Sequence, residues 1–273
     1  MIESILVATD GSSAALSAEA VAIDLAKRLG ARLRGLTVID DRLRAALTTP
    51  DVGASFPGAA GLDAFLKARA DVIAERFAER TRAAGLAASC ESAQGRPDDR
   101  IVESGAGDDL VVLGRHGQSA GLPTALPGSV TEAVLRKATR SVLVVPSGAS
   151  LRGPLLLAYD ASPGARRAAA CAIELARRLG EPVHLFVDSK DKGRSRARFD
   201  DVRKLLAELP HRGSEISSTL GRPDAKIVEA AEALGCGLVV MGAFGRNRIS
   251  DHFLGSNASA VMRTSARPVL LVR

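Results

Sequence analysis

Glycines recur at short intervals near the C-terminus, in the run MGAFGRNRISDHFLGSN. Gly242 ends an apolar run, Gly245 follows it, and Gly255 directly precedes Ser256 and Asn257. A glycine lets the backbone approach a ligand without a Cβ atom in the way. A helix that begins near Gly255 would present unpaired N–H groups and the positive end of its dipole, which suit an anion. The spacing predicts a cradle for phosphate groups; the alternative interpretation is a tight turn followed by a helix cap.

Two aspartates could complete such a site. Asp10 and Asp160 each follow a short apolar run, at residues 4–8 and 155–158, that would suit a strand buried on both faces. In an open parallel sheet, ligands bind at the carboxyl ends of the strands where the strand order reverses. A carboxylate there can accept hydrogen bonds from ribose hydroxyls or an adenine amino group, and it repels phosphate. Support of the adjacent helix is the alternative role for Asp160.

Apolar runs alternate with helical patterns along the chain. Ser162 can cap a helix, Pro163 fits its first position, and Gly180 with Pro182 ends it. Each half therefore reads as βαβαβαβαβ with a parallel sheet, an α/β fold. The predicted strands are residues 4–8, 32–38, 86–92, 109–114 and 141–146 in the first half, and 155–158, 182–187, 215–220, 237–242 and 268–272 in the second.

The chain is an internal duplication. AIDLAKRLGA from Ala22 matches AIELARRLGE from Ala172, and GRPDDRIVE from Gly95 matches GRPDAKIVE from Gly221. Because the separation falls from 150 to 126 residues, the first copy carries about 24 extra residues between these landmarks. We expect most of them in a long mobile loop at residues 48–61, which is rich in Gly, Pro and Ala.

The duplication predicts two domains, residues 1–147 and 152–273, with the boundary in a small, polar, turn-prone segment. The last predicted strand of each copy would lie at a sheet edge, where exposed apolar strands invite pairing. We therefore predict that these two strands cover each other within one chain, as a pseudo-twofold pair.

Taken together, the glycines, the aspartates, the strand order and the duplication resemble the tandem form of the universal stress protein family. Its nucleotide-binding members carry G-x2-G-x9-G-[S/T], and the runs TDGS, YDAS and ARPVLLV extend the likeness. The resemblance implies a sheet order of 3-2-1-4-5, with adenine and ribose near the strand-one aspartate and the end of strand two, and with phosphates on the glycine loop. In the second half it points to Asp160, Val187, Gly242, Gly245, Gly255, Ser256 and Asn257, and the cation Arg246 adds charge to the same loop. In the first half it points to Asp10, Val38, Gly114, Gly117, Gly128, Ser129 and Val130.

The first copy departs from this pattern. Ten residues separate Gly117 from Gly128, and Pro127 precedes Gly128. Proline removes a backbone donor and restricts the residue before it. The second copy has Arg246, Arg248 and His252 between the corresponding glycines, whereas the first has no cation there. We predict that the second cradle binds triphosphate better, and that the first is weak, empty or remodelled.

We expect an ATP-binding stress-response regulator, with ATP, ADP or AMP chiefly in the C-terminal domain and any Mg²⁺ carried by the phosphates. No catalytic residue is assigned, because the sequence lacks G-x-x-x-x-G-K-[ST] and S-G-G-x-D-S. A slow ATPase or nucleotidyl-transfer enzyme, with Asp251 or His252 as base, is the second interpretation. A nucleotide-free interaction scaffold is the third.

Charge and composition limit the classes of partner that the protein could bind. The net charge of +6 divides into −1 for residues 1–150 and +7 for residues 151–273, and much of the excess lies in SKDKGRSRARFDDVRK. That run reads as a solvated helix face, with an acidic partner as the alternative. Nucleic acid is disfavoured because no aromatic side chains interleave with the cations.

The cysteines and the apolar runs suggest the cellular compartment of the protein. The three cysteines have no C-x-x-C spacing, so neither a disulfide framework nor a zinc site is expected. The sequence lacks a signal peptide and a long apolar segment, so we expect a cytoplasmic protein without a membrane partner. A homodimer of the tandem chain and an unidentified protein partner are further expectations.

Overall fold

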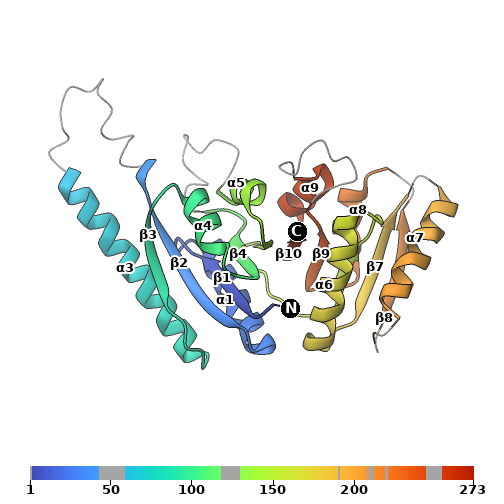
Figure 1. Cartoon of the computed structure of the whole chain (residues 1–273), viewed down its shortest axis with the longest axis horizontal. Coiled ribbons are helices and arrows are strands. Elements are labelled where there is room, and N and C mark those ends of the chain that lie inside the picture. Colours follow the sequence, from blue (N-terminus) through green and yellow to red (C-terminus); the bar gives the residue numbers. More distant parts are fainter. Residues whose placement is uncertain are drawn as a thin grey trace, which may run out of the picture.

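The structure is a computed structural model that describes residues 2–42, 59–117, 130–189, 191–207, 209, 212–218, 221–243 and 254–273. In these ranges ten strands form one sheet, in the order β3-β2-β1-β4-β5-β10-β9-β6-β7-β8 (Figure 1). The strands of the first half are β1 (Ser4–Ala8), β2 (Arg32–Asp40), β3 (Cys90–Gly95), β4 (Leu110–Gly114) and β5 (Ser141–Val145). Those of the second half are β6 (Leu155–Ala158), β7 (Val183–Asp188), β8 (Arg212–Ser218), β9 (Leu238–Gly242) and β10 (Val269–Val272).

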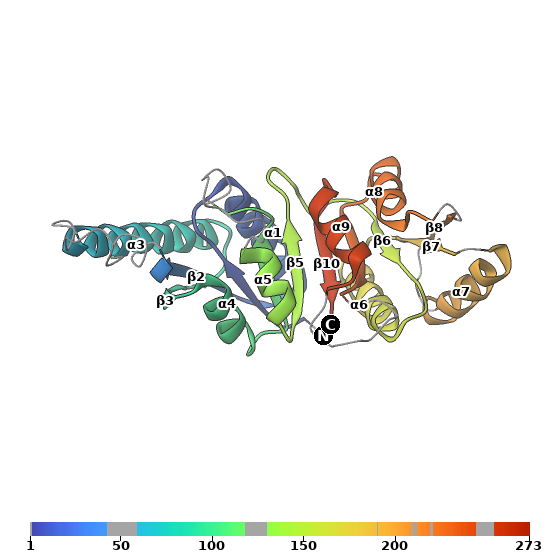
Figure 2. The ribbon, with the colours of Figure 1, turned by 90° about the horizontal axis from the view of Figure 1, so that it is seen from above.

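The strand order confirms the predicted α/β fold. Each half has the order 3-2-1-4-5, and its strands pair in parallel. The halves meet where β5 and β10 pair antiparallel, with Leu143 opposite Leu270, and Figure 2 shows these two strands side by side. The predicted pairing of the last strands within one chain is therefore confirmed.

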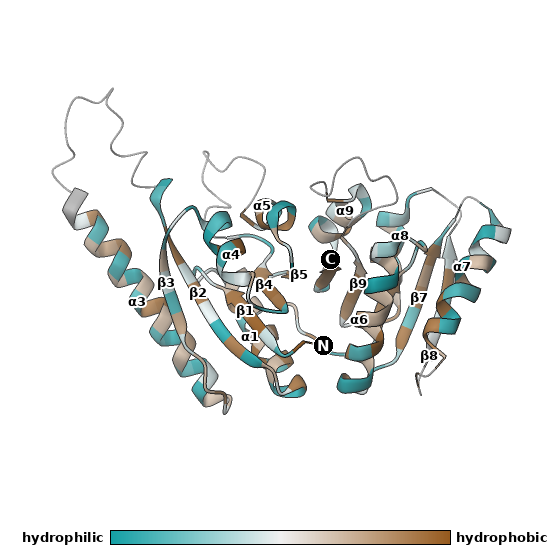
Figure 3. Ribbon diagram, in the orientation of Figure 1, coloured by the Kyte–Doolittle hydropathy of each residue, from teal (hydrophilic) through white to brown (hydrophobic). Residues whose placement is uncertain are grey.

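Helices cover both faces of the sheet. Strand residues alternate between two core clusters, so that Ile5 and Val7 join one cluster and Leu6 the other. Helices α1 (Ser13–Leu29), α3 (Ala59–Ala83), α6 (Pro163–Leu179) and α7 (Lys192–Leu205) pack on the first cluster. Helices α4 (Pro97–Gly105), α5 (Val130–Lys137), α8 (Pro223–Ala233) and α9 (Ser256–Thr264) pack on the second. Figure 3 shows the hydrophobic residues gathered on the central strands between these layers.

Local signals in the sequence set the bounds of α6. The Ser162 hydroxyl accepts the N–H of Ala165, Pro163 is the first helical residue, and Gly180 ends the helix in the left-handed region at φ 69°. These observations confirm the predicted start and stop of this helix.

Two edge strands and one loop have bounds that differ from those predicted from the sequence. β3 covers 90–95 rather than 86–92, and β8 covers 212–218 rather than 215–220. Both are edge strands with mostly polar residues, so an apolar run does not mark them. The loop predicted at 48–61 ends earlier, because α3 begins at Ala59; the rest of that loop lies outside the described residues. Part of the extra length is helical, since α3 has 25 residues and α7 has 14.

Two arginines, one from each half, also join the halves by donating hydrogen bonds to each other's half. Arg28 of α1 donates a hydrogen bond to the carbonyl of Leu179, at the end of α6, at 2.9 Å. Arg178 of α6 donates to the carbonyl of Leu29, at the end of α1. Each guanidinium therefore lies at the negative end of the other half's helix. This reciprocal contact fixes the two halves on the face that α1 and α6 cover.

Candidate functional site

Asp10 and Asp160 lie directly beyond β1 and β6, where the strand order reverses in each half. The Asp160 Oδ1 atom accepts the N–H of Ser162 at 2.9 Å, and Asp10 Oδ1 accepts the N–H of Ser12 at the same distance. Each serine in turn caps the following helix. The aspartates therefore hold the turn that begins α1 or α6, and they also stand at the carboxyl edge of the sheet. The helix-support role is present in the structure.

The first glycine of each motif is needed for packing on a helix. A Cβ atom on Gly242 would lie 2.8 Å from the carbonyl carbon of Gly164 and 3.0 Å from the nitrogen of Ala165. A Cβ atom on Gly114 would lie 2.7 Å from the carbonyl carbon of Ala14. These neighbours are helix backbone, which cannot rotate away as a side chain can. The close approach of β9 to α6 therefore demands a glycine at position 242 with or without a ligand, and the role of Gly242 in a phosphate site stays a prediction.

The loop after β4 reaches the strand-one aspartate in the first half. A Cβ atom on Gly117 would lie 2.9 Å from Asp10 Oδ2, so these two predicted site residues are adjacent. Arg69 of α3 also donates a hydrogen bond to the Asp10 carbonyl, at 3.2 Å. The sequence analysis missed Arg69, because it lies within a helix, away from the strand ends and glycine runs that marked the site. Gly128 and Ser129 lie outside the described residues.

In the second half, α9 begins beside the end of β9. Gly255 is the cap residue of α9, and its N–H donates to the carbonyl of Ala243 at 2.9 Å. No side chain caps this helix in the part of the chain that the structure describes, and Ser256 and Asn257 are exposed. The first turn of α9 therefore presents its N–H groups to the carboxyl edge of the sheet. Gly245, Arg246, Arg248, Asp251 and His252 lie outside the described residues.

The match between Val38 and Val187 is wrong by one residue. Ala8 pairs with Leu36 and Ala158 pairs with Phe186, so the residue two further along is Val38 in β2 and Asp188 in β7. Val187 is fully buried in the core cluster on the other face of the sheet. Side chains alternate along a strand, so the two valines face opposite sides. The 150-residue separation of the copies was a signal in the sequence that could have found Asp188.

Asp188 differs from the other carboxylates at this edge. Its Oδ1 atom is buried and has no hydrogen-bond partner within the described ranges. Its main-chain carbonyl accepts a hydrogen bond from Arg198 of α7. An acceptor that is buried without a donor carries a desolvation cost of about 1–3 kcal/mol, and more when it is charged. Asp188 is therefore a candidate site residue in its own right.

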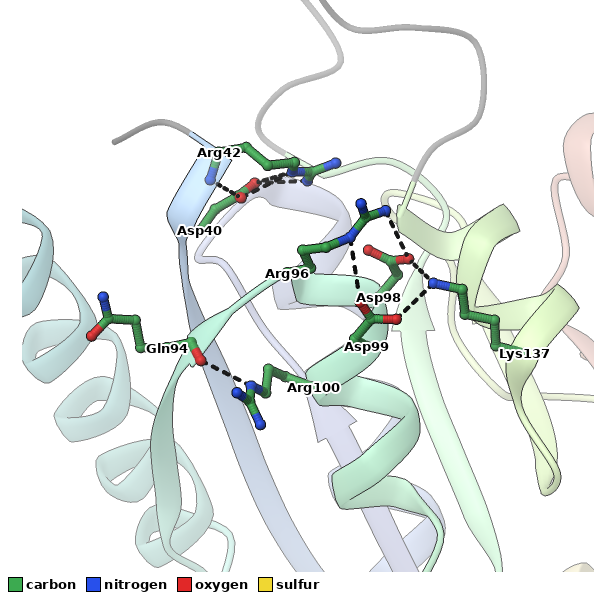
Figure 4. A network of polar contacts seen from close by, with 8 residues as sticks. All are labelled: Asp40, Arg42, Gln94, Arg96, Asp98, Asp99, Arg100 and Lys137. Carbon is green, nitrogen blue, oxygen red and sulfur yellow. Dashed lines mark hydrogen bonds and ion pairs between the residues drawn. The ribbon is translucent and has the colours of Figure 1, made fainter. Parts of the chain in front are cut away.

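Carboxylates at the edge of the first half have cationic neighbours (Figure 4). Lys137 of α5 lies 2.5 Å from Asp98 Oδ2 and 2.7 Å from Asp99 Oδ1. Burial alone would raise the pKa of the Asp98 carboxyl, but the bond to Lys137 and the field of Arg96 hold it below its usual value. Asp40, at the end of β2, pairs with Arg42 at 2.7 Å. Charge on this edge is therefore balanced within the protein.

Buried polar networks tie the end of strand one to the helices on the opposite face. In the first half, Thr9 donates to Glu19 of α1, and Arg80 of α3 donates to the same carboxylate at 2.7 Å. In the second half, Tyr159 donates to Asp201 of α7. Burial, followed by this bond, raises the pKa of Tyr159 well above its usual range, so the phenol stays protonated. These bonds hold the turns that carry Asp10 and Asp160.

The described residues contain neither a membrane-spanning helix nor a cluster of metal-binding side chains. Over those residues, no helix is both long and apolar enough to cross a membrane. The same residues hold no group of three or more His, Cys, Asp or Glu side chains that could bind a metal ion.

These features define a tandem pair of doubly wound α/β units, joined through their last strands, with a strand-order reversal in each. The chain belongs to the universal stress protein family, because the sequence model of that family matches residues 1–146 and again residues 152–273. A universal stress protein of Synechocystis sp. is 25% identical over 289 residues, covering 100% of both chains. Another, from Mycobacterium bovis, is 28% identical over 197 residues, which cover 65% of this chain and 66% of the relative. The crystal structure of a universal stress protein from Archaeoglobus fulgidus has the same fold, with a TM-score of 0.77 over 100% of this chain and 99% of that one, at 23% identity.

Proposed function

We propose that this universal stress protein is a regulatory protein that binds ATP, chiefly in its second half. The observation that carries the proposal is the start of α9 beside the end of β9: Gly255 precedes the helix, Ser256 and Asn257 are exposed in its first turn, and no side chain of the described residues caps it. Such a helix start binds anions through its unpaired N–H groups and its dipole. The intact glycine spacing of the second copy and the membership of the family support the same assignment.

Charge sets the direction in which the nucleotide would lie. The phosphates belong at the start of α9, whereas the carboxylates of Asp160 and Asp188 would repel them. Base and ribose therefore belong at the ends of β6 and β7, where carboxylates can accept hydrogen bonds from N–H and O–H groups. Any Mg²⁺ would be held by the phosphates themselves.

The proposed role is regulation through occupancy. A nucleotide that binds one conformation better than another shifts the population toward that conformation. Turnover would need a base close to the γ-phosphate. The two candidates in the sequence, Asp251 and His252, lie outside the described residues, so nothing in the described geometry favours hydrolysis over binding.

Mass spectrometry of nucleotide released from the purified, denatured protein tests the proposal directly. We expect an adenine nucleotide in the supernatant, and calorimetric titration of the emptied protein should give saturable ATP binding. Ser256→Ala should weaken ATP more than AMP, because the hydroxyl would face a phosphate oxygen. Ser259→Ala, one turn further along α9, is the matched control. No released nucleotide, together with no binding of millimolar ATP, would refute the proposal.

A further inference from the structure

The positive charge of the second half is concentrated on two helices. α6 and α7 together contain ten Lys or Arg residues against three Asp or Glu, a net charge of +7. This equals the whole excess of residues 151–273, so the rest of that half is neutral. The helices on the opposite face, α8 and α9, carry a net charge of −1, and the matching helices of the first half, α1 and α3, carry +1. The fold therefore does not require a cationic layer at this place.

The exposed residues of α6 and α7 form one surface, which we call the basic face. Both helices pack on the first core cluster, and Arg166 of α6 lies 2.8 Å from Asp201 of α7. Figure 3 shows hydrophilic residues along both helices. Arg196 and Arg203 are exposed and seven residues apart, so they lie on the same side of α7 at a spacing of about 10 Å. Cations therefore follow each other along the outside of this layer.

Some cations of the basic face already have a carboxylate partner, and others do not. Arg203 lies 2.8 Å from Asp200, one turn earlier in α7. Arg167, Arg196 and Lys204 are exposed and form no ion pair with any described residue. Like charges that gather on one surface repel each other. A partner that neutralises these three cations would relieve that repulsion.

The structure distinguishes between the classes of anionic partner. A basic helix that lies on a membrane buries its apolar side in lipid, whereas Phe199, Val202 and Leu206 of α7 are buried in the protein core. Leu205 is the one large hydrophobic residue exposed in the described parts of these helices, and it is aliphatic, so single-stranded nucleic acid finds no stacking platform. Duplex nucleic acid carries about one charge per 1.7 Å and would press phosphates against Asp200. Lipid and nucleic acid therefore fit this surface poorly.

We propose that the basic face of α6 and α7 docks an acidic segment of another protein. Side-chain carboxylates of such a segment can reach individual guanidinium groups, as Asp200 reaches Arg203, and can avoid the positions where this face carries acids. Eight of the ten cations are arginine, which holds a carboxylate through two parallel N–H···O bonds. The helix that carries the proposed phosphate site, α9, packs on the opposite face of the sheet. The inference therefore does not depend on the proposed function.

Fluorescence anisotropy of a labelled Glu-rich peptide, titrated with the full chain, tests the inference. We expect saturable binding at about 0.15 M salt that weakens as salt rises, because exposed charges are screened. Arg196→Glu combined with Lys204→Glu should weaken binding 10-fold or more. Arg76→Glu combined with Arg82→Glu changes the net charge equally at exposed cations of α3, and should weaken binding less than 3-fold. Equal losses in the two double variants would show attraction by net charge alone and overturn the inference.

The competing occupants are tested under the same conditions. Duplex DNA and vesicles that contain phosphatidylserine are titrated beside the peptide. Tighter binding of either one, lost in Arg196→Glu with Lys204→Glu, would overturn the assignment to an acidic protein. No binding of the peptide by the wild-type protein would show a solvated surface and overturn it as well.

Stability and the second helix provide further readouts. The α7 double variant should melt at the wild-type temperature, because neither Arg196 nor Lys204 has an ion-pair partner among the described residues. Arg167→Glu, on α6, repeats the test without changing α7 and should weaken peptide binding 3-fold or more. Unchanged binding by Arg167→Glu would overturn the joint surface of the two helices. ATP titration of the same variants should match wild type, so failure of the proposed function leaves this result intact.

Discussion

At the residue scale, the motif glycines serve more than one purpose. Gly242 lies against the backbone of the first turn of α6, and Gly114 lies in the same way against α1. Gly255 has φ −57° and ψ 139°, a conformation that any residue can adopt, so its backbone angles do not require glycine. A sequence motif can thus combine positions that the fold requires with positions that only a ligand would require.

Gly242→Ala should therefore destabilise the protein even without nucleotide. A Cβ atom 2.8 Å from helix backbone forces β9 and α6 apart, and such overpacking costs about 1–3 kcal/mol. Gly114→Ala should cost a similar amount. Urea unfolding of the apo protein measures both changes. Gly107→Ala, where a Cβ atom would meet nothing within 4 Å, is the control. Wild-type stability for Gly242→Ala, with lost ATP affinity, would restore the ligand-approach interpretation.

Substitutions at Asp160 separate its two roles. Asp160→Ala removes the acceptor for the Ser162 N–H and should lower the free energy of unfolding by about 1 kcal/mol. Asp160→Asn keeps an acceptor oxygen, so its stability should stay close to that of wild type. If the carboxylate also binds ribose or base, both variants should weaken ATP, ADP and AMP by similar factors. Thermal melts and titrations on the same samples decide this; intact affinities in both variants would remove Asp160 from the site.

At the element scale, side chains between neighbouring helices hold the edge of the first half. The contact of α4 with α5 depends on Lys137, which reaches the buried carboxylate of Asp98 and the exposed one of Asp99. The same bonds raise the pKa of Lys137. The second half has Thr264 at the matching place in α9, so this clamp is specific to the first half.

Lys137→Met should reduce stability in a pH-dependent way. The lowered pKa of Asp98 means that its contribution is present above the unfolded-state value of about 4 and is lost as pH falls through the folded-state value. Since Lys137 is partly exposed, we expect a loss of about 1 kcal/mol at pH 7 that shrinks below pH 4. Urea unfolding at pH 7, 5, 4 and 3 measures it. Arg136→Met, at the neighbouring exposed cation, is the control. A loss that does not depend on pH would assign the effect to packing alone.

At the scale of the whole molecule, the two halves protect each other's sheet edges. β5 and β10 pair through Val142 to Val144 and Val269 to Leu271, all buried. An apolar edge strand without a partner is a template for pairing with another chain. The arginine exchange between α1 and α6 adds a polar contact on one face of the same seam.

Residues 1–147 expressed alone should therefore form dimers. The free edge of β5 would pair with β5 of a second copy, in place of β10. Light scattering after size-exclusion chromatography should report twice the mass of the fragment at micromolar concentration. Val144→Pro in the same fragment removes a backbone N–H from this edge and should shift it toward the monomer. A monomeric fragment with native circular dichroism would contradict this prediction.

The sequence alone determined the features that depend on local or periodic signals. The alternation of strands and helices and the bounds of α6 follow from patterns within a few tens of residues, and the duplication follows from matching runs that lie 126 to 150 residues apart. The sheet order came from the family resemblance, and the pairing of β5 with β10 followed because an apolar edge needs a partner. The edge strands β3 and β8 were misplaced, because polar strands leave no apolar run to find.

The tertiary structure decided which residues meet across long separations. The strand register places Asp188, rather than Val187, at the position that Val38 holds in the first half, because a shift of one residue turns a side chain to the other face of a sheet. Only the packing of β9 on α6 explains Gly242, and only the position of α3 brings Arg69 to Asp10. These contacts join residues that lie far apart along the chain. Their existence depends on how the layers pack, which no local pattern encodes.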